Sequence, residues 1–224
     1  MKLNNIEIYL SILITERMRF EFYLLVSIFV PILNDRTQMS VTREKIIELG
    51  ENLILTKGYN AFSYQDISTE LGIKNAAIHY YFPTKEKLGT SIVKTNIQRF
   101  EEMIDNMHSR DFDEWQQLES FVKIYIKSQK EQKLCIIGSL GPDINTLNET
   151  TRVELVRMTE LILTWLTDVL TKGKEKKLFA FNEEPQNKAA IILSGLVASL
   201  QLARIVEKLD YRSIYRSITE SLKP

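Results

Sequence analysis

A single glycine between two short helical segments is the feature that most constrains this fold. Gly72 follows Tyr64–Leu71 and can end a helix there after about two turns, because glycine readily adopts left-handed backbone angles. A second short helix is expected over Asn75–Tyr81, and it must stop there because the residue before Pro83 disfavours helical angles. The sequence therefore predicts two short helices joined by a tight turn, a helix-turn-helix.

Residues on both sides of this motif support the prediction. Ser63 can cap the first short helix, and Asp66 follows three residues later, where a carboxylate can return a hydrogen bond to the cap. Upstream, Thr42–Lys57 places apolar side chains at helical spacing. Downstream, Thr84 can cap a long helix over Lys85–Met107. The motif is therefore expected between two longer helices.

The remainder of the chain predicts more helices and no sheet. Glycine and proline are scarce, with 8 and 5 residues among 224, and neither strict apolar alternation nor hairpin turn signals recur. Breaks are expected at Gly141-Pro142 and across Gly173–Pro185. The expected helices are Asp113–Lys130, Gln132–Ser139, Asn148–Lys172, Asn187–Leu209 and Tyr211–Leu222. The predicted fold class is all-α: an N-terminal three-helix domain with the helix-turn-helix, followed by a larger helical domain.

Charge and reactive residues limit the possible functions. The chain has 29 basic and 29 acidic residues, so it lacks the surplus of Lys and Arg that indiscriminate nucleic-acid binding needs, although site-specific binding stays open. The single cysteine, Cys135, excludes an internal disulfide and a cysteine-rich zinc cluster, and it suits a reducing cytoplasm. With only His79 and His108 and no glycine-rich phosphate loop, no catalytic set can be assembled. We expect no enzyme activity, cofactor or bound metal.

The first 38 residues contain an apolar run, Phe22–Leu33. Its 12 residues are fewer than the roughly 20 that span a bilayer, and it lacks the basic leader and cleavage site of a secretion signal. We interpret residues 1–38 as upstream sequence with Met39 as the working start, and we expect no stable membrane association. One alternative is an extra helix that docks on the rest of the chain. Another is a membrane-associated helical interaction protein that uses the apolar run.

The run from Gly72 to Leu88, GIKNAAIHYYFPTKEKL, resembles the tetracycline-repressor (TetR) family of DNA-binding regulators. The matching positions are Gly72, Ile73, Ile78, His79, Tyr80, Tyr81, Phe82, Pro83, Lys85 and Leu88 and, upstream, Arg43, Ile46, Lys57, Gly58, Tyr59, Phe62, Ser63, Asp66 and Ile67. The resemblance is specific over Thr42–Leu88 and only architectural beyond. It implies a cytoplasmic transcription regulator, more commonly a repressor than an activator, that binds double-stranded operator DNA.

The residue chemistry of the motif agrees with DNA binding. Lys74 and Asn75 open the helix that would enter the major groove, where Lys suits guanine edges and Asn suits adenine edges. Small residues after them allow close approach, and polar-tipped aromatic residues and helix N-termini suit phosphates. The expected DNA-binding residues are Ser63, Tyr64, Gln65, Lys74, Asn75, Ala76, Ala77, His79, Tyr80, Tyr81 and Lys85. In the alternative interpretation, at least one of Tyr80 and Tyr81 belongs to the core together with Phe82.

The last two expected helices are candidates for a dimer interface. Ala189–Val206 is apolar on nearly every side, which is more than one core-facing stripe requires, so it must be buried in its own core or by a partner. Tyr211–Leu222 would add a second helix with Ile214, Ile218 and Leu222 inward. The resemblance implies a homodimer through these two helices, which would present two recognition helices to a symmetric operator.

The resemblance also implies an effector cavity among the helices between Phe100 and Leu170, with the apolar walls and occasional polar tips that are typical of small-molecule pockets. The candidate ligand-binding residues are Phe121, Tyr125, Cys135, Ile137, Met158, Leu161, Ile162 and Trp165. An ordinary packed core is the simpler interpretation of each residue taken singly. Cys135 is expected to be a small buried hydrophobic residue, with redox sensing as the alternative.

These patterns predict three parts and one mechanism. Residues 1–38 would be an N-terminal extension, 39–89 the helix-turn-helix DNA-binding domain, and 90–224 the helical regulatory and dimerisation domain. The recognition helices of a dimer would lie one DNA turn apart, about 34–36 Å. An unidentified small-molecule effector that prefers another separation would weaken DNA binding, with the change transmitted through the helix that follows the motif.

Overall fold

The computed structural model describes residues 42–206 and 211–224, and the chain divides into two compact units, Met1–Lys45 and Ile46–Pro224. Of the first unit only residues 42–45 are described, and they are helical. The apolar run Phe22–Leu33, Met39 and the alternatives that depend on them lie outside the described residues. Among the residues that are described, no helix is long and apolar enough to cross a bilayer.

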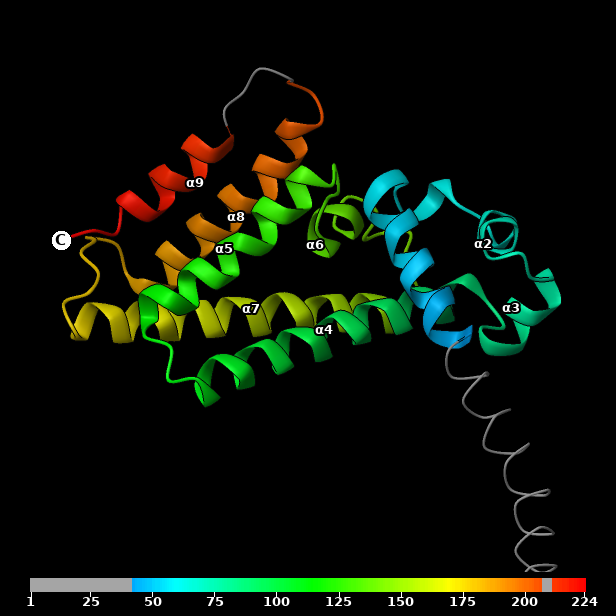
Figure 1. Ribbon diagram of the computed structural model, residues 1–224, viewed down its shortest axis with the longest axis horizontal. Coiled ribbons are helices and arrows are strands. Elements are labelled where there is room, and N and C mark those ends of the chain that lie inside the picture. The colour runs from blue at the N-terminus through cyan, green and yellow to red at the C-terminus, as the bar shows by residue number, and fades with distance from the viewer. Residues whose placement is uncertain (1–41, 207–210) are drawn as a thin grey trace, which may run out of the picture. The chain divides into compact units, whose positions relative to one another are not determined.

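Three helices and a short 3-10 turn form the head, which here means residues 46–84. They are residues 46–57 of the helix that spans residues 42–57, η1 (Tyr59–Ala61), α2 (Tyr64–Leu71) and α3 (Asn75–Tyr81) (Figure 1). The bounds of α2 and α3 are those that the sequence predicts. Gly72 adopts a left-handed φ of 64°, and the Ile73 amide donates to the carbonyl of Ser68 at 3.0 Å. The turn between α2 and α3 therefore depends on the glycine, as expected.

Apolar side chains from all parts of the head meet in one small core. The fully buried members are Ile46, Ile54, Ile67 and Ile78, and Phe82 is only 2% exposed. Helices as short as α2 and α3 are marginal in isolation, because too few hydrogen bonds offset the cost of starting a helix. Their positions therefore depend on this shared burial.

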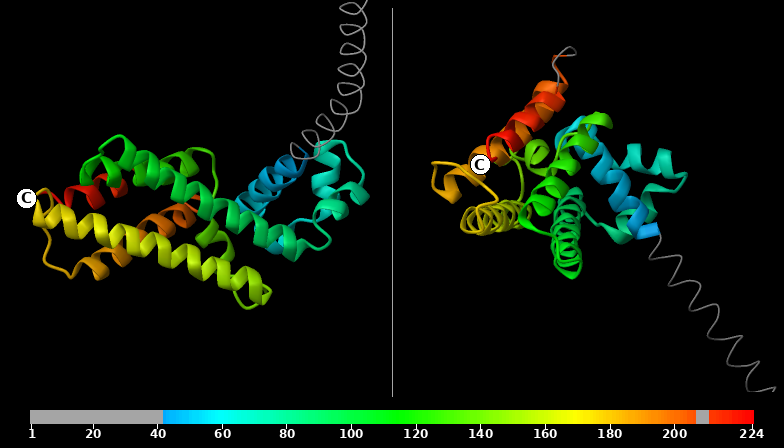
Figure 2. Two further views of the ribbon diagram at one scale, coloured as in Figure 1. Left: turned by 90° about the horizontal axis from the view of Figure 1, so that it is seen from below. Right: turned by 60° about the vertical axis from the view of Figure 1, so that its left-hand side comes forward.

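Six helices form the body, which here means residues 85–222. They are α4 (Lys85–Ser109), α5 (Glu114–Lys130), α6 (Ile136–Leu140), α7 (Glu149–Glu175), α8 (Pro185–Ala203) and α9 (Tyr211–Glu220). The long α7 packs against α4, α5 and α8, and α8 packs in turn against α5, α6 and α9 (Figures 1 and 2). The described residues contain no strand, so the predicted all-α fold is confirmed. The first helix of the body, α4, begins directly after the head and continues through residue 89 without a break.

The helix predicted over Gln132–Ser139 is wrong at its start. It begins four residues later, at the first residue of α6. Gln132 has a left-handed φ of 56°, which helical backbone does not allow. The amide of Leu134 donates at 3.0 Å to the carbonyl of Leu55 in the head, so this stretch connects to the head rather than to its own helix.

Two other predicted boundaries also differ. Gly173, which was expected to break the chain, lies inside α7, and a Cβ there would be 2.1 Å from the ring of Phe179. The glycine therefore permits close packing and does not end the helix. The helix predicted to reach Leu209 ends at Ala203, and residues 207–210 lie outside the described part.

Candidate DNA-binding and effector sites

The candidate recognition face consists of the residues that α3 and its N-cap expose. Lys74 caps α3 in an extended conformation, and Tyr80, one and a half turns later, is 69% exposed. The exposed residues are Lys74, Asn75, Ala76, His79 and Tyr80, whereas Ala77 and Tyr81 are half-buried. Ile78 is fully buried in the head core and fixes the orientation of the helix. The leading side chains of α3 are therefore accessible to a DNA groove.

A chain of side-chain hydrogen bonds joins α2 to the start of α3. Nδ2 of Asn75 donates to Oε1 of Gln65 at 3.0 Å, and Nε2 of Gln65 donates to Oγ1 of Thr69 at 3.1 Å. All three side chains are exposed. These two hydrogen bonds orient the Asn75 amide. The sequence analysis did not include Thr69, although its spacing of four residues from Gln65 on a helix face could have indicated it.

Tyr64 and His79, both expected at DNA, have contacts within the head. The half-buried Tyr64 donates its hydroxyl to the carbonyl of Phe82 at 2.9 Å, and burial, reinforced by Glu86, raises the Tyr64 pKa above its ordinary value. The His79 ring stands edge-on to the Tyr64 ring with 4.9 Å between centroids, and its Nδ1 lies 3.2 Å from the carbonyl oxygen of Pro83. These contacts hold the end of α3 against the start of α2.

Lys85 and Ser63 also have partners within the head. Nζ of Lys85 donates to the carbonyl of Phe62 at 2.5 Å and lies 4.3 Å from the centroid of that ring, and partial burial lowers the Lys85 pKa. The amide and the hydroxyl of Ser63 both donate to Oδ2 of Asp66, at 2.8 and 2.7 Å, and these bonds lower the Asp66 pKa. The predicted hydrogen bond between the cap and the carboxylate is present, with Ser63 as the donor and Asp66 as the acceptor. The starts of α2 and α4 are thus fixed by side chains.

Tyr80 and Tyr81 differ in burial. Tyr80 is exposed, whereas Tyr81 is half-buried and packs against the head core. Their rings meet edge-on with 5.1 Å between centroids. Of the aromatic run, Phe82 and part of Tyr81 therefore belong to the core, and Tyr80 is the tyrosine with an accessible ring.

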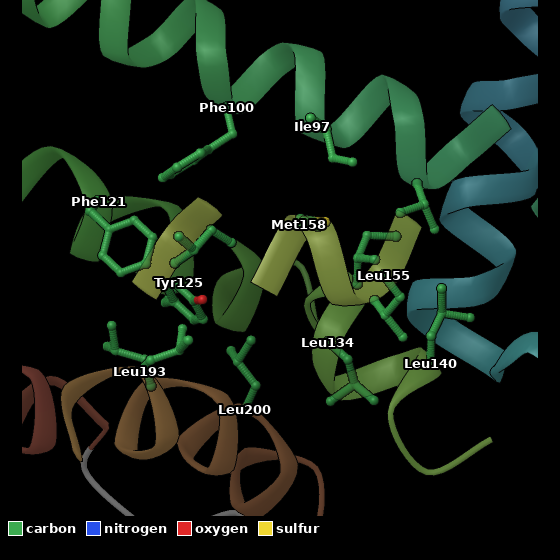
Figure 3. Close-up of a cluster of buried hydrophobic side chains, with 14 of the residues drawn as sticks. Ile97, Phe100, Phe121, Tyr125, Leu134, Leu140, Leu155, Met158, Leu193 and Leu200 are labelled. Atoms are coloured by element: carbon green, nitrogen blue, oxygen red, sulfur yellow. The ribbon is translucent and has the colours of Figure 1, made fainter. Parts of the chain in front are cut away.

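The candidate effector residues come from α5, α6 and α7 and from Cys135 just before α6, and Figure 3 shows Phe121, Tyr125 and Met158 among the buried side chains of the body. Phe121 and Tyr125 come from α5, and Trp165 comes from α7. The buried members are Phe121, Tyr125, Met158, Ile162 and Trp165, whereas Cys135, Ile137 and Leu161 are half-buried. Phe100 of α4 joins this cluster, with its ring centroid 5.4 Å from Trp165 and 6.1 Å from Phe121 in edge-on contacts. All eight predicted residues lie in or against the hydrophobic core, which also includes the buried residues of the head.

Two polar groups in this cluster differ in how they are satisfied. Nε1 of Trp165 is buried and has no hydrogen-bond partner among the described residues. The thiol of Cys135 accepts a hydrogen bond from the amide of Gly138 at 3.3 Å as the N-cap of α6. Burial raises the pKa of this thiol, which disfavours the thiolate form. The cluster therefore offers one open donor, the Trp165 indole.

Comparisons with known proteins place this geometry in a family. The family model described as bacterial regulatory proteins, tetR family, matches residues 46–90. A solved TetR-family regulator from Agrobacterium tumefaciens is 26% identical with a TM-score of 0.76, covering 83% of this chain and 100% of its own. A TetR regulator from Legionella pneumophila is 28% identical with a TM-score of 0.72, covering 81% and 97%. The chain belongs to the TetR family.

Two curated relatives of this TetR-family protein are named as repressors. The HTH-type transcriptional repressor DhaR of Mycobacterium sp. (strain GP1) is 20% identical over 75% of this chain and 86% of its own length. The HTH-type transcriptional repressor NemR of Escherichia coli (strain K12) is 24% identical over 75% and 88%. The protein is accordingly a DNA-binding transcriptional regulator, and its family is one of regulators rather than enzymes.

A junction between the head and the body was missed by the sequence analysis. Nη2 of Arg204, just after α8, donates at 2.7 Å to the carbonyl of Thr56, near the end of the 42–57 helix. Nε2 of Gln201 donates at 2.9 Å to the carbonyl of Gly138 in α6. The last carbonyls of any helix need partners outside it, but the sequence does not indicate which distant residue supplies them. The TetR-family regulator thus has a direct contact from α8 to its head.

Proposed function

We propose that this TetR-family protein is a cytoplasmic repressor that binds operator DNA as a homodimer and is released by a small-molecule effector. The exposed face of α3, led by Lys74 and Asn75, carries the proposal. Two relatives that are named as repressors support repression over activation. Residues 39–89 act as the DNA-binding domain, residues 90–224 regulate and dimerise, and residues 1–38 form an extension that neither task requires.

The proposed DNA contacts divide into base readers, phosphate contacts and supporting residues. Lys74 and Asn75 read base edges, and Ala76 and Ala77 allow the helix to approach them closely. Ser63, Gln65, His79, Tyr80 and Tyr81 contact phosphates from the edges of the motif. Tyr64 and Lys85, which bond to head carbonyls, fix the helix N-termini that face the DNA backbone.

The proposed dimer surface is the outward face of α8. Ile191 is 56% exposed and Leu202 is 44% exposed, and the exposed Ser194 and Ala198 lie between them on the same face. Such an apolar stripe with small residues allows a second helix to pack closely. Of α9, Leu222 beyond its last turn is buried and Ile214 and Ile218 are half-buried, so its apolar side faces the body and its outward side would frame the interface.

The proposed effector site is the aromatic cluster around Trp165. Its open Nε1 donor and its apolar walls suit an apolar ligand with one hydrogen-bond acceptor. The ligand-binding residues would be Phe121, Tyr125, Cys135, Ile137, Met158, Leu161, Ile162 and Trp165. A ligand that separates these rings would have to move α5, α6 or α7.

Two connections can transmit such a movement to the head. One is α4, which contributes Phe100 to the cluster and begins directly after the recognition motif. The other is the junction at Leu134 and Arg204, which links α6 and α8 to the end of the 42–57 helix. An effector that favours a different arrangement of these contacts would weaken operator binding by its differential affinity for the two states.

A genomic selection tests the proposal. Fragments of the source genome are incubated with the purified full chain, and the bound fragments are sequenced and measured by gel shift. We expect a small set of fragments that share an inverted repeat with half-sites about one DNA turn apart. A purified dimer that retains no fragment in preference to random DNA would overturn the DNA-binding assignment. A monomer that binds single half-sites would overturn the dimer alone.

A further inference from the structure

A pocket lies where α4 ends, α5 begins and α7 ends. These helix ends lie at the left in Figure 1. It has a volume of about 540 Å³, and none of the proposed effector residues lines it. Phe112 and Val169 give it an apolar wall, and the remaining lining is mainly charged. The pocket is therefore separate from the aromatic cluster and has a different chemistry.

Glu114, the first residue of α5, lines this pocket with an incompletely paired carboxylate. The side chain is only 4% exposed, and its Oε1 accepts a hydrogen bond from Nζ of Lys176 at 2.7 Å. Its Oε2 is shielded from solvent and has no hydrogen-bond partner among the described residues. The nearby amide of Gln116 is already bonded to Asp113 at 2.8 Å. A buried carboxylate oxygen without a donor is costly, so this atom points to a donor that arrives from outside the chain.

The charges around the pocket indicate whether the ligand that supplies this donor is a cation or an anion. Four carboxylates line it, against two lysines, and this leaves an excess of two negative charges. Lys172 is held by Asp168 at 2.6 Å, and Lys176 is already bound to Glu114. The described residues contain no group of three His, Cys, Asp or Glu side chains that could hold a metal ion. The lining therefore favours an organic cation over an anion or a metal.

We propose that this pocket binds a small organic cation, ideally one with two positive charges, whose ammonium group donates to Oε2 of Glu114. The aliphatic part of the ligand lies against Phe112 and Val169, and its second charge faces the remaining carboxylates at the rim. Lys176 shows that the Glu114 carboxylate already accepts an ammonium group on its other oxygen. Because Lys176 is 61% exposed, it can move away when a ligand enters.

Calorimetric titration of the full chain with 1,4-diaminobutane tests this site, with uncharged 1,4-butanediol as the matched ligand. We expect saturable binding of the diamine and none of the diol. Glu114→Gln should remove binding. Lys176→Ala should tighten binding, because it removes the ammonium group that competes with the ligand for the Glu114 carboxylate. Lys133→Ala, which breaks an ion pair with Glu131 away from the pocket, should leave the dissociation constant unchanged.

Several outcomes would overturn the cation site. One is the absence of diamine binding by both the native chain and Lys176→Ala, when thermal unfolding shows that the variant is folded. Another is Glu114→Gln that unfolds like the native chain yet binds the diamine equally well. A third is weaker binding by Lys176→Ala, which would mean that the lysine holds the ligand. The titration contains no DNA, so its result is independent of operator binding.

Discussion

The head and the body of this protein treat their shielded polar groups differently. In the head, the Tyr64 hydroxyl donates to the carbonyl of Phe82, and the carbonyl of Phe62 accepts from Lys85 at the start of α4. In the described part of the chain, the buried side-chain nitrogen and oxygen atoms without a hydrogen-bond partner belong to the body: Glu114 Oε2, Ser139 Oγ, Glu154 Oε2 and Trp165 Nε1. One of these, on Glu154, still lies 3.6 Å from Arg157.

This difference suits the tasks proposed for the two regions. A DNA-binding domain loses the least conformational entropy on binding when its helices are already fixed in the free protein. The paired polar groups of the head fix its helices in this way. A region that responds to ligands needs groups that a ligand can satisfy better than the empty protein does. The unpaired atoms of Glu114, Ser139 and Trp165 are such groups, and each costs some stability until it is paired. The following substitutions test the difference.

Phe82→Ala should have the largest effect, because Phe82 connects α3 to the core of the head while its carbonyl accepts the Tyr64 hydroxyl. Loss of a buried phenyl ring costs about 3–5 kcal/mol of unfolding free energy. Urea unfolding measures the loss, and the exposed Tyr80→Ala is the control, with an expected change within about 0.5 kcal/mol. Equal losses from the two variants would mean that the head is not held by this core.

Lys74→Ala should cost about 1–3 kcal/mol of operator binding and relax the preference at one base position. The side chain is exposed at the start of α3, so the unfolding free energy should not change. Gel shifts with the selected operator and with single-base variants measure both effects. Lys123→Ala, an exposed lysine of α5, is the control. If both variants weaken binding equally and for every sequence, Lys74 supplies only charge.

Tyr64→Phe should cost about 0.5–1.5 kcal/mol of unfolding free energy, because it removes the hydroxyl that pairs the carbonyl of Phe82 and leaves the ring in place. Tyr80→Phe removes an exposed hydroxyl and should change nothing measurable. Thermal unfolding of the two variants under the same conditions gives the comparison. No difference between them would show that water replaces the Tyr64 hydroxyl without cost, and the head would then not depend on its internal pairing.

The parts of the fold that the sequence predicts correctly depend on neighbouring residues. Ser63, Gly72 and Pro83 determine the ends of α2 and α3 through local backbone and capping preferences, and the bounds of both helices follow. The predicted start of α6 is wrong because the amide of Leu134 bonds to the carbonyl of Leu55, a residue far away in the chain. No local pattern contains that partner.

The candidate sites also combine features that local sequence predicts with features that depend on distant residues. A helical period and a family motif identify the exposed residues of α3, but they do not reveal that Lys85 turns toward the carbonyl of Phe62. The pocket at Glu114 is built from the ends of three helices, so it depends on helix lengths and packing that periodicity does not specify. Arg204 reaches Thr56 across 148 positions, and only the folded chain brings them together.

Ser139→Ala should have the smallest effect and the opposite sign. The hydroxyl of Ser139 in α6 is buried and unpaired, so its removal takes away a desolvated polar group and leaves almost no cavity. We expect the unfolding free energy to rise by up to about 1 kcal/mol.

Thr84→Ala is the matched change in a paired hydroxyl. The Thr84 hydroxyl accepts a hydrogen bond from the amide of Lys87 as the N-cap of α4, and its loss should cost about 1 kcal/mol of unfolding free energy. Chemical unfolding of both variants gives the two signs directly. If Ser139→Ala destabilises the protein as much as Thr84→Ala does, the hydroxyl of Ser139 has a partner in solution. The contrast between a paired head and an open body would then have to be given up for α6.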